Sequence, residues 1–249
     1  MKPHDLHTHT TYSDGKNPVV DHIRGAEAAG LSYLAITDHC FNPSAAEWIT
    51  QMRDDIRAVK THVTVFAGIE AQIRDASGAT TVPQQETEKL DIILVDIGGM
   101  TEGVFRNPPA SKQMAIKNAV TAYVNVSADP LVDIVAHPFN LGRTPSGIAS
   151  TDITDADVRT VARAFAANGM IFEIMNSSWW WFPDEDIASF TKRYADIVRI
   201  AAEENVRLSK GSDAHAVCGV GMLSWVDRVI AMAGVEKAII DPSMFVRNA

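Results

Sequence analysis

Short apolar segments alternate with longer amphipathic segments along most of the chain. The short segments are predicted to be strands, over 3–7, 32–37, 63–69, 91–96, 131–136, 170–173 and 207–209. The longer segments carry apolar residues at helical spacing and are predicted to be helices, over 18–29, 44–60, 111–126, 155–167, 184–203 and 223–233. Because strands and helices alternate, the strands are expected to run parallel in one sheet.

This alternation predicts an α/β fold, with the sheet closed or nearly closed into a barrel. The segment 72–83 has no helical period and is expected to form either a hairpin or an irregular excursion. Asp184 precedes the fifth predicted helix and is expected to cap its amino terminus. No Pro/Gly/Ser-rich linker divides the sequence, so residues 1–249 are predicted to form a single domain.

Composition excludes several classes of protein. The net charge of −9 disfavours sequence-independent binding to nucleic acid, which depends on clustered lysine and arginine. Two cysteines do not make a disulfide framework. The first residues lack the apolar stretch of a signal peptide, and no run of 18 apolar residues occurs. These features predict a cytoplasmic protein with no membrane segment and no stable nucleic-acid partner.

Histidines and acids gather where predicted strands end. They are His7 and His9, the Thr37-Asp38-His39 run, Glu70, His137, and Asp213 with His215. In a βα barrel the carboxyl ends of all strands meet on one face, where active sites are built. A His-x-His pair on an extended segment points both imidazoles to one side, which suits a single cation. The set therefore predicts a metal site, whereas His4, His22 and His62 fit no strand end and are interpreted as structural.

Together with the Ser13-Asp14-Gly15 turn, these motifs resemble the four-motif pattern of the PHP (polymerase and histidinol phosphatase) superfamily. Their order and spacing agree from about residue 5 to residue 216. The resemblance implies a distorted (β/α)7 barrel. It also implies two or three divalent metal ions, usually zinc, iron or manganese, and hydrolysis of phosphate esters.

The resemblance also implies a division of labour among the ligands. One metal would be held by His7 and His9 with Glu70 and Asp213. Glu70 would bridge to a second metal, helped by His137. A third would be held by Asp14, His39 and His215. Asp5 is expected to orient an imidazole, and the groups expected to act in catalysis are Glu70, Asp213 and His215.

The fourth predicted strand departs from the family pattern. Many members have a further histidine here, and by strand counting Gly98 stands in its place. Asp96, two residues earlier, faces the same side while the strand continues, and it is predicted to be a replacement ligand. Water or substrate filling the gap is the alternative, so the number of metals stays open between two and three.

The chemistry expected of such a site is attack on phosphorus by a hydroxide that bridges two cations. Arg143 and Lys210 are predicted to bind the substrate phosphate, because Arg143 follows the His137 motif and Lys210 shortly precedes Asp213. The Trp179–Trp181 run is expected either to stack on a flat group of the substrate or to pack against the barrel rim or another subunit.

The leading prediction is therefore a phosphoesterase for a small phosphorylated metabolite or nucleotide. Histidinol-phosphate phosphatase is an alternative, although no loop singles out histidinol. An exonuclease is disfavoured by the acidic charge. A relative that hydrolyses C–N or C–O bonds, or one that binds metal without activity, also stays open. The oligomeric state is not predicted.

Overall fold

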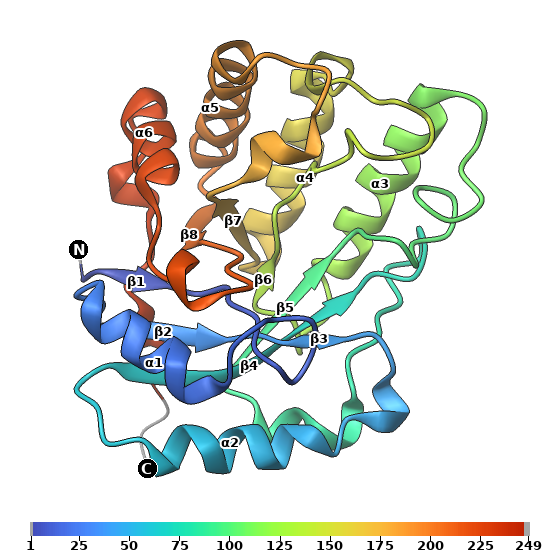
Figure 1. The fold of residues 1–249 in the computed structure, drawn as a ribbon. Helices are drawn as coiled ribbons and strands as arrows, with labels where there is room; N and C mark the ends of the chain where they lie inside the picture. The colour runs from blue at the N-terminus through green and yellow to red at the C-terminus, as the bar shows by residue number, and fades with distance from the viewer. Residues whose placement is uncertain (1, 247–249) are drawn as a thin grey trace.

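The computed structural model describes residues 2–246 and is built around one parallel sheet (Figure 1). The strands are β1 (His4–Asp5), β2 (Tyr33–Ile36), β3 (His39–Cys40), β4 (Thr64–Gln72), β5 (Ile92–Asp96), β6 (Ile134–Val135), β7 (Ile171–Met175) and β8 (Arg207–Gly211). Their order is β1-β2-β4-β5-β6-β7-β8, with β3 beside β4, and every pairing is parallel.

Hydrogen bonds link the first strand of the sheet to the last. The amide of Leu6 donates to the carbonyl of Lys210 over 3.0 Å. Just beyond the strands, the amide of Asp213 donates to His7 and the amide of His9 donates to Ala214, each over 2.9 Å. These bonds bring the two edges together, so the sheet is nearly closed. The predicted (β/α)7 barrel is confirmed.

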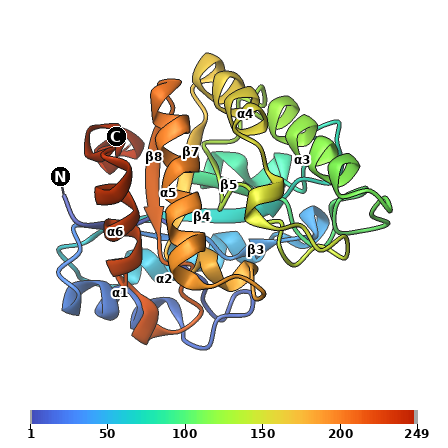
Figure 2. The ribbon, with the colours of Figure 1, turned by 90° about the horizontal axis from the view of Figure 1, so that it is seen from above.

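Within residues 2–246, six α-helices surround the sheet (Figures 1 and 2). They are α1 (Val19–Ala28), α2 (Trp48–Ala58), α3 (Lys112–Val126), α4 (Asp155–Asn168), α5 (Ile187–Glu203) and α6 (Ser224–Ala233). Between β4 and β5 the chain forms only a 3₁₀ segment, Gln84–Lys89. The missing helix at this position is one source of the distortion of the barrel.

Side-chain alternation along the strands creates two apolar clusters. The smaller cluster includes Leu6, Ala35, Phe66 and Leu94, and the C-terminal segment adds residues such as Phe245 to it. The larger cluster joins the other faces of the strands to the helices. Both are buried, and together they fix the strand ends that carry the polar groups.

Two details of the structure differ from the sequence-based predictions, and a third decides between two alternatives. Strand β3 is an additional short strand that was not predicted. Helix α5 is capped by Asp186, whose carboxylate accepts a hydrogen bond from the amide of Ser189 over 2.9 Å, so the prediction of Asp184 was wrong. The segment 72–83 contains an antiparallel bridge between Ile73 and Thr80, as expected of a short hairpin.

No helix within residues 2–246 is both long enough and apolar enough to cross a bilayer.

Candidate metal centre

The nine predicted metal ligands lie together at the carboxyl ends of the strands. Seven of them line a cavity of about 490 Å³: Asp14, His39, Glu70, Asp96, His137, Asp213 and His215. The other two, His7 and His9, follow β1 and are completely buried beside the same carboxylates. Sequence reasoning therefore identified a set of groups that the fold brings to one place.

His7 and His9 face the same two carboxylates. The Nε2 atom of His7 lies 3.4 Å from Glu70 and 3.6 Å from Asp213. The Nε2 atom of His9 lies 3.6 Å from Glu70 and 3.0 Å from Asp213. Two ligands of one tetrahedral zinc, with bonds of about 2.0–2.1 Å, are separated by about 3.3 Å. The four observed separations fall around that value, so this group could hold one cation.

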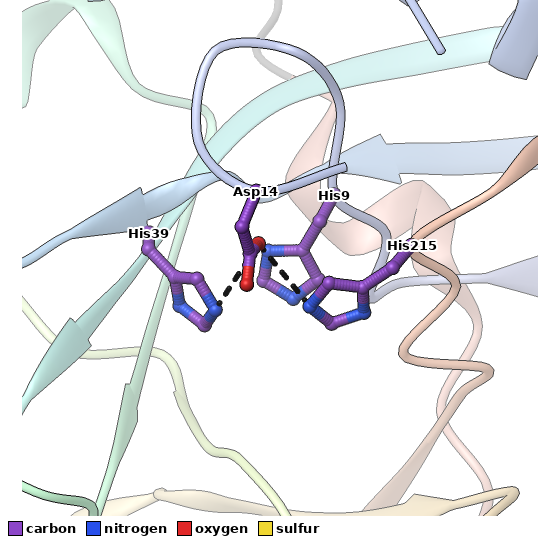
Figure 3. A group of neighbouring side chains, drawn as sticks. All are labelled: His9, Asp14, His39 and His215. Carbon is purple, nitrogen blue, oxygen red and sulfur yellow. Dashed lines mark ion pairs between the residues drawn. The ribbon is translucent and has the colours of Figure 1, made fainter. Parts of the chain in front are cut away.

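A second group surrounds the carboxylate of Asp14 (Figure 3). Asp14 lies on the loop between β1 and α1 and points between two imidazoles. Its Oδ1 atom is 3.6 Å from Nε2 of His39 and 3.2 Å from Nε2 of His215. His9 completes the group, with ring centroids 4.2 Å from His39 and 4.3 Å from His215. His9 thus stands between two possible metal positions.

A third group joins Glu70, Asp96 and His137. The Nε2 atom of His137 lies 3.0 Å from Oε1 of Glu70. The Oδ1 atom of Asp96 is buried without a hydrogen bond in the described part of the chain. Glu70 also lies 2.9 Å from Nδ1 of His39, so it contacts all three groups. That position is the one expected of a bridging ligand.

The position of the expected further histidine is sterically closed. A Cβ atom on Gly98 would lie 2.0 Å from Nε2 of Gln72 and 2.6 Å from Oδ2 of Asp96. The Gln72 amide lies 3.4 Å from Asp96 and accepts a hydrogen bond from the amide of Met100. Gln72 therefore occupies the space beside Asp96, and a side chain at Gly98 would require it to move.

Glu173, on β7, is the buried acid that sequence reasoning missed. One of its oxygens lies 2.8 Å from Nδ1 of His7, and the other accepts a hydrogen bond from the amide of His137 over 2.8 Å. Its position as the last residue of the predicted strand 170–173 could have identified it as a further polar group at the same face of the barrel. Asp5 was expected to orient an imidazole, and this was wrong. Its carboxylate accepts only backbone amides among the hydrogen bonds described, including those of Ser212 and Gly221.

Electrostatics within the cluster favour added positive charge. Burial lowers the pKa of His7, but the charges of Glu173, Glu70 and Asp213 outweigh it and raise that pKa well above its usual value. Burial, assisted by the charge of Glu70, raises the pKa of Asp96 to about 7. In the protein alone, protons on His7, His39 and His137, whose pKa values are raised by the neighbouring carboxylates, offset the buried negative charge, and divalent cations could replace them.

Several buried ring nitrogens in the cluster lack hydrogen-bond partners in the described part of the chain, which indicates whether these residues could hold metal ions. Both ring nitrogens of His9, Nε2 of His7 and Nδ1 of His39 are buried and make no hydrogen bond of acceptable geometry within residues 2–246. Burying such groups without a partner is costly. Imidazole nitrogen and carboxylate oxygen together suit zinc, iron or manganese. The donor set therefore fits divalent cations.

Two of the candidate ligands have strained backbones. His137 and Asp213 have φ values of 31° and 55°, in the left-handed region that non-glycine residues rarely adopt. Each such residue costs on the order of 1–3 kcal/mol and persists where the surrounding structure imposes it. Here the strain accompanies the turn of the chain after β6 and β8, which carries both side chains toward the cavity.

The two predicted phosphate-binding residues do not line the cavity. The prediction for Lys210 was wrong. Side chains alternate along β8, so Lys210 lies on the same outward face as Leu208. Its ammonium group pairs with Asp227 of α6 over 3.1 Å. The guanidinium of Arg143 stacks on the ring of Trp180, 3.5 Å from the centroid, and its Nε donates to the carbonyl of that residue.

Comparisons with known proteins agree with this arrangement. A family model described as "PHP domain" matches residues 5–177. A "probable phosphatase" of Thermoanaerobacter sp. (strain X514) is 28% identical over 239 residues, covering 95% of this chain and 88% of the relative. A "probable phosphatase" of Proteus mirabilis (strain HI4320) is 26% identical over 234 residues, covering 93% of this chain and 86% of the relative.

A solved structure has a similar fold. It is the histidinol phosphate phosphatase of Lactococcus lactis subsp. lactis Il1403, complexed with zinc, L-histidinol and phosphate. The TM-score is 0.64 at 17% identity, with 94% of each chain covered. The similarity therefore concerns the barrel as a whole.

Proposed function

Because this chain belongs to the PHP domain family, we propose that it is a metal-dependent phosphoesterase acting on a small phosphorylated metabolite or nucleotide. The observation that carries the proposal is the set of buried ring nitrogens of His7, His9 and His39 that make no hydrogen bond within residues 2–246. Such a set is costly to bury unless it holds cations. The relatives named probable phosphatases support the choice of a phosphate ester.

We assign the metal positions to the three groups of side chains. The first group consists of His7, His9, Glu70 and Asp213, and the second consists of Asp14, His39 and His215 with His9 nearby. The third group has only Glu70, Asp96 and His137. Since Gln72 fills the space beside Asp96, this third group has fewer strong donors. We therefore expect two tightly held ions, with a third held more weakly between Glu70 and Asp96.

The chain's own residues set the tautomers of two candidate ligands, His215 and His7. The carbonyl of Asp213 can only accept a hydrogen bond, so Nδ1 of His215, 2.9 Å away, carries the proton. That tautomer turns the lone pair of Nε2 toward Asp14. Glu173 holds Nδ1 of His7 in the same way. When bound, divalent cations supply Lewis acidity and lower the pKa of water.

Histidinol phosphate is a second candidate substrate. The similar solved structure was complexed with L-histidinol and phosphate, and the cavity of this chain has aromatic walls that could receive an imidazole. Direct comparison of histidinol phosphate with nucleoside monophosphates would decide between the two candidates.

The test combines metal analysis with phosphate release. Protein purified without chelators is expected to contain stoichiometric metal and to release phosphate from monoesters. Glu70→Gln should lose most of the metal and nearly all hydrolysis, because one carboxylate contacts all three groups. Glu203→Gln, a half-exposed residue in surface ion pairs, is the matched control. Wild-type protein with neither bound metal nor hydrolysis after addition of Mn²⁺ or Zn²⁺ would refute the proposal.

A further inference from the structure

Part of the cavity wall is aromatic and apolar, in contrast to the polar candidate ligands. Besides the candidate ligands, its lining includes Phe41, Met175, Trp180 and Trp181. No lysine or arginine of residues 2–246 lines it. A substrate whose phosphate sits at the metal ligands would therefore place the rest of the molecule against aromatic rings.

The aromatic side chains are fixed against the ligand cluster. Phe41 stacks on His39 with ring centroids 4.5 Å apart, and Trp181 stacks on His137 at 5.7 Å. Trp180 contacts Trp181 edge-on, and the guanidinium of Arg143 stacks on the ring of Trp180. Rings held by such contacts lose little conformational freedom on binding a ligand. The wall is therefore preorganised on both sides of the metal ligands.

Two of these rings are unusually exposed. Phe41 is 40% exposed and Trp180 is 51% exposed, although both line a cavity. Large apolar surface left open beside a polar centre commonly marks a ligand-binding site. A flat group covering these rings would remove that surface from water.

Charge in the cavity limits what else the substrate can carry. The carboxylates of Asp14 and Asp213 also line the cavity, and within the described chain no basic side chain lines it to balance a second anion. The phosphate itself is the only anionic group for which the site has partners. A second phosphate or a carboxylate would lie unpaired beside carboxylates, which is unfavourable.

We infer that the alcohol portion of the substrate carries a flat aromatic group without an anionic substituent, and that this group stacks on Phe41 and Trp180. The inference rests on the proposed function, since it describes the leaving group of the same ester. It makes Phe41 and Trp180 determinants of specificity. Trp179 is a neighbouring tryptophan that is 36% exposed but does not line the cavity.

The test compares three monoesters with the metal-loaded enzyme: benzyl phosphate, ethyl phosphate and phosphoglycolate. Benzyl and ethyl phosphate release unactivated primary alcohols, and phosphoglycolate is ethyl phosphate with a carboxylate in place of its methyl group. We expect kcat/KM to be about tenfold higher for benzyl than for ethyl phosphate, and lowest for phosphoglycolate.

Single substitutions separate specificity from damage to the fold. Trp180→Ala and Phe41→Ala should each remove most of the preference for benzyl phosphate, measured as the ratio of kcat/KM for benzyl phosphate to kcat/KM for ethyl phosphate. Trp179→Ala should preserve the preference. Equal kcat/KM for benzyl and ethyl phosphate in the wild type, or an equal loss for both esters in Trp180→Ala, would overturn the inference.

A binding measurement distinguishes failure of this inference from failure of the proposed function. If no ester is hydrolysed, the proposed function is rejected. Calorimetric titration of the metal-loaded protein with benzylphosphonate and ethylphosphonate still tests the aromatic site. Tighter binding of benzylphosphonate, lost in Trp180→Ala and kept in Trp179→Ala, supports the inference, and equal affinities reject it.

Discussion

At the scale of single residues, Glu173 shows how a side chain outside the cavity can control the ligands. Its two oxygens accept from two donors, Nδ1 of His7 and the backbone amide of His137. It is buried, with 1% exposure, so water does not substitute for either contact. The carboxylate thereby fixes the tautomer of one candidate ligand and the backbone of another.

Glu173→Gln should weaken metal binding without removing a ligand. Glutamine has the same shape but only one acceptor oxygen, so one of the two donors loses its partner or His7 changes tautomer. We expect metal affinity to fall by about 10- to 100-fold, measured by competition with a chromogenic chelator. Glu203→Gln should not change the affinity. Unaltered affinity in Glu173→Gln would show that the hydrogen bonds are dispensable.

His4 is a buried histidine that belongs to none of the candidate metal groups. Its Nδ1 lies 3.0 Å from the carbonyl of Lys2, and its Nε2 is buried without a hydrogen bond in the described structure. Burial lowers its pKa to about 4. At neutral pH the imidazole is neutral in both the folded and the unfolded chain, so it does not affect the free energy of unfolding. As pH falls below about 6.5, the unfolded chain binds the proton more readily, and the free energy of unfolding decreases until the folded form itself titrates near pH 4.

Between pH 7.5 and pH 5, this single group should lower the free energy of unfolding by about 2 kcal/mol. His4→Asn keeps a donor near the carbonyl of Lys2 and removes the titration. Urea denaturation of both proteins at the two pH values isolates the effect of His4, since other titrations are common to both. The same pH dependence in wild type and His4→Asn would contradict the assignment.

At this scale the residues that form the candidate metal groups could be predicted, whereas the surroundings of Lys210 and Arg143 could not. His7, Glu70 and Asp213 belong to motifs whose residue types are sufficient to indicate metal binding. Arg143 and Lys210 were chosen because they lie close in sequence to His137 and Asp213, and sequence proximity does not determine which face a side chain takes. The alternation along β8 directs Lys210 to α6 instead.

At the scale of secondary structure, the alternation of strands and helices was predicted and the ends of the elements were not. Strand β3 pairs with β4 over only two residues, so its existence depends on a neighbour distant in sequence. Helix α2 begins at Trp48, after a separate 3₁₀ turn, and not at residue 44. Local periodicity identifies an element, but hydrogen bonding to the rest of the fold decides where it stops.

The amino terminus of α5 provides a matched pair for measurement. Asp186→Ala removes the carboxylate that accepts from Ser189, and it should lower the free energy of unfolding by about 1 kcal/mol. Asp184→Ala, two residues earlier, should change it by less than about 0.5 kcal/mol. Chemical denaturation of both variants measures the difference. Equal effects, or a larger effect at Asp184, would contradict the cap seen in the structure.

At the scale of the whole molecule, the barrel closes where the beginning and the end of the fold meet. His7 and His9 follow β1, and Asp213 and His215 follow β8. Backbone hydrogen bonds join the same segments, including Leu6 to Lys210. The convergence of strand ends made the site predictable from topology, but the contacts across this junction depend on closure of the barrel, which sequence alone does not quantify.

Metal removal should therefore loosen the junction of β1 and β8 more than the rest of the barrel. Ions held jointly by His7, His9 and Asp213 would link the two segments, and a ligand at 1,000 times its dissociation constant stabilises the folded state by about 4 kcal/mol. Chelation should lower the melting temperature and increase amide exchange in residues 4–9 and 207–215. Exchange in β4 and β5, at the centre of the sheet, should change much less. Uniform loss of protection would instead indicate that the metals stabilise the barrel globally, and no change in either region would argue against metal ligands at this junction.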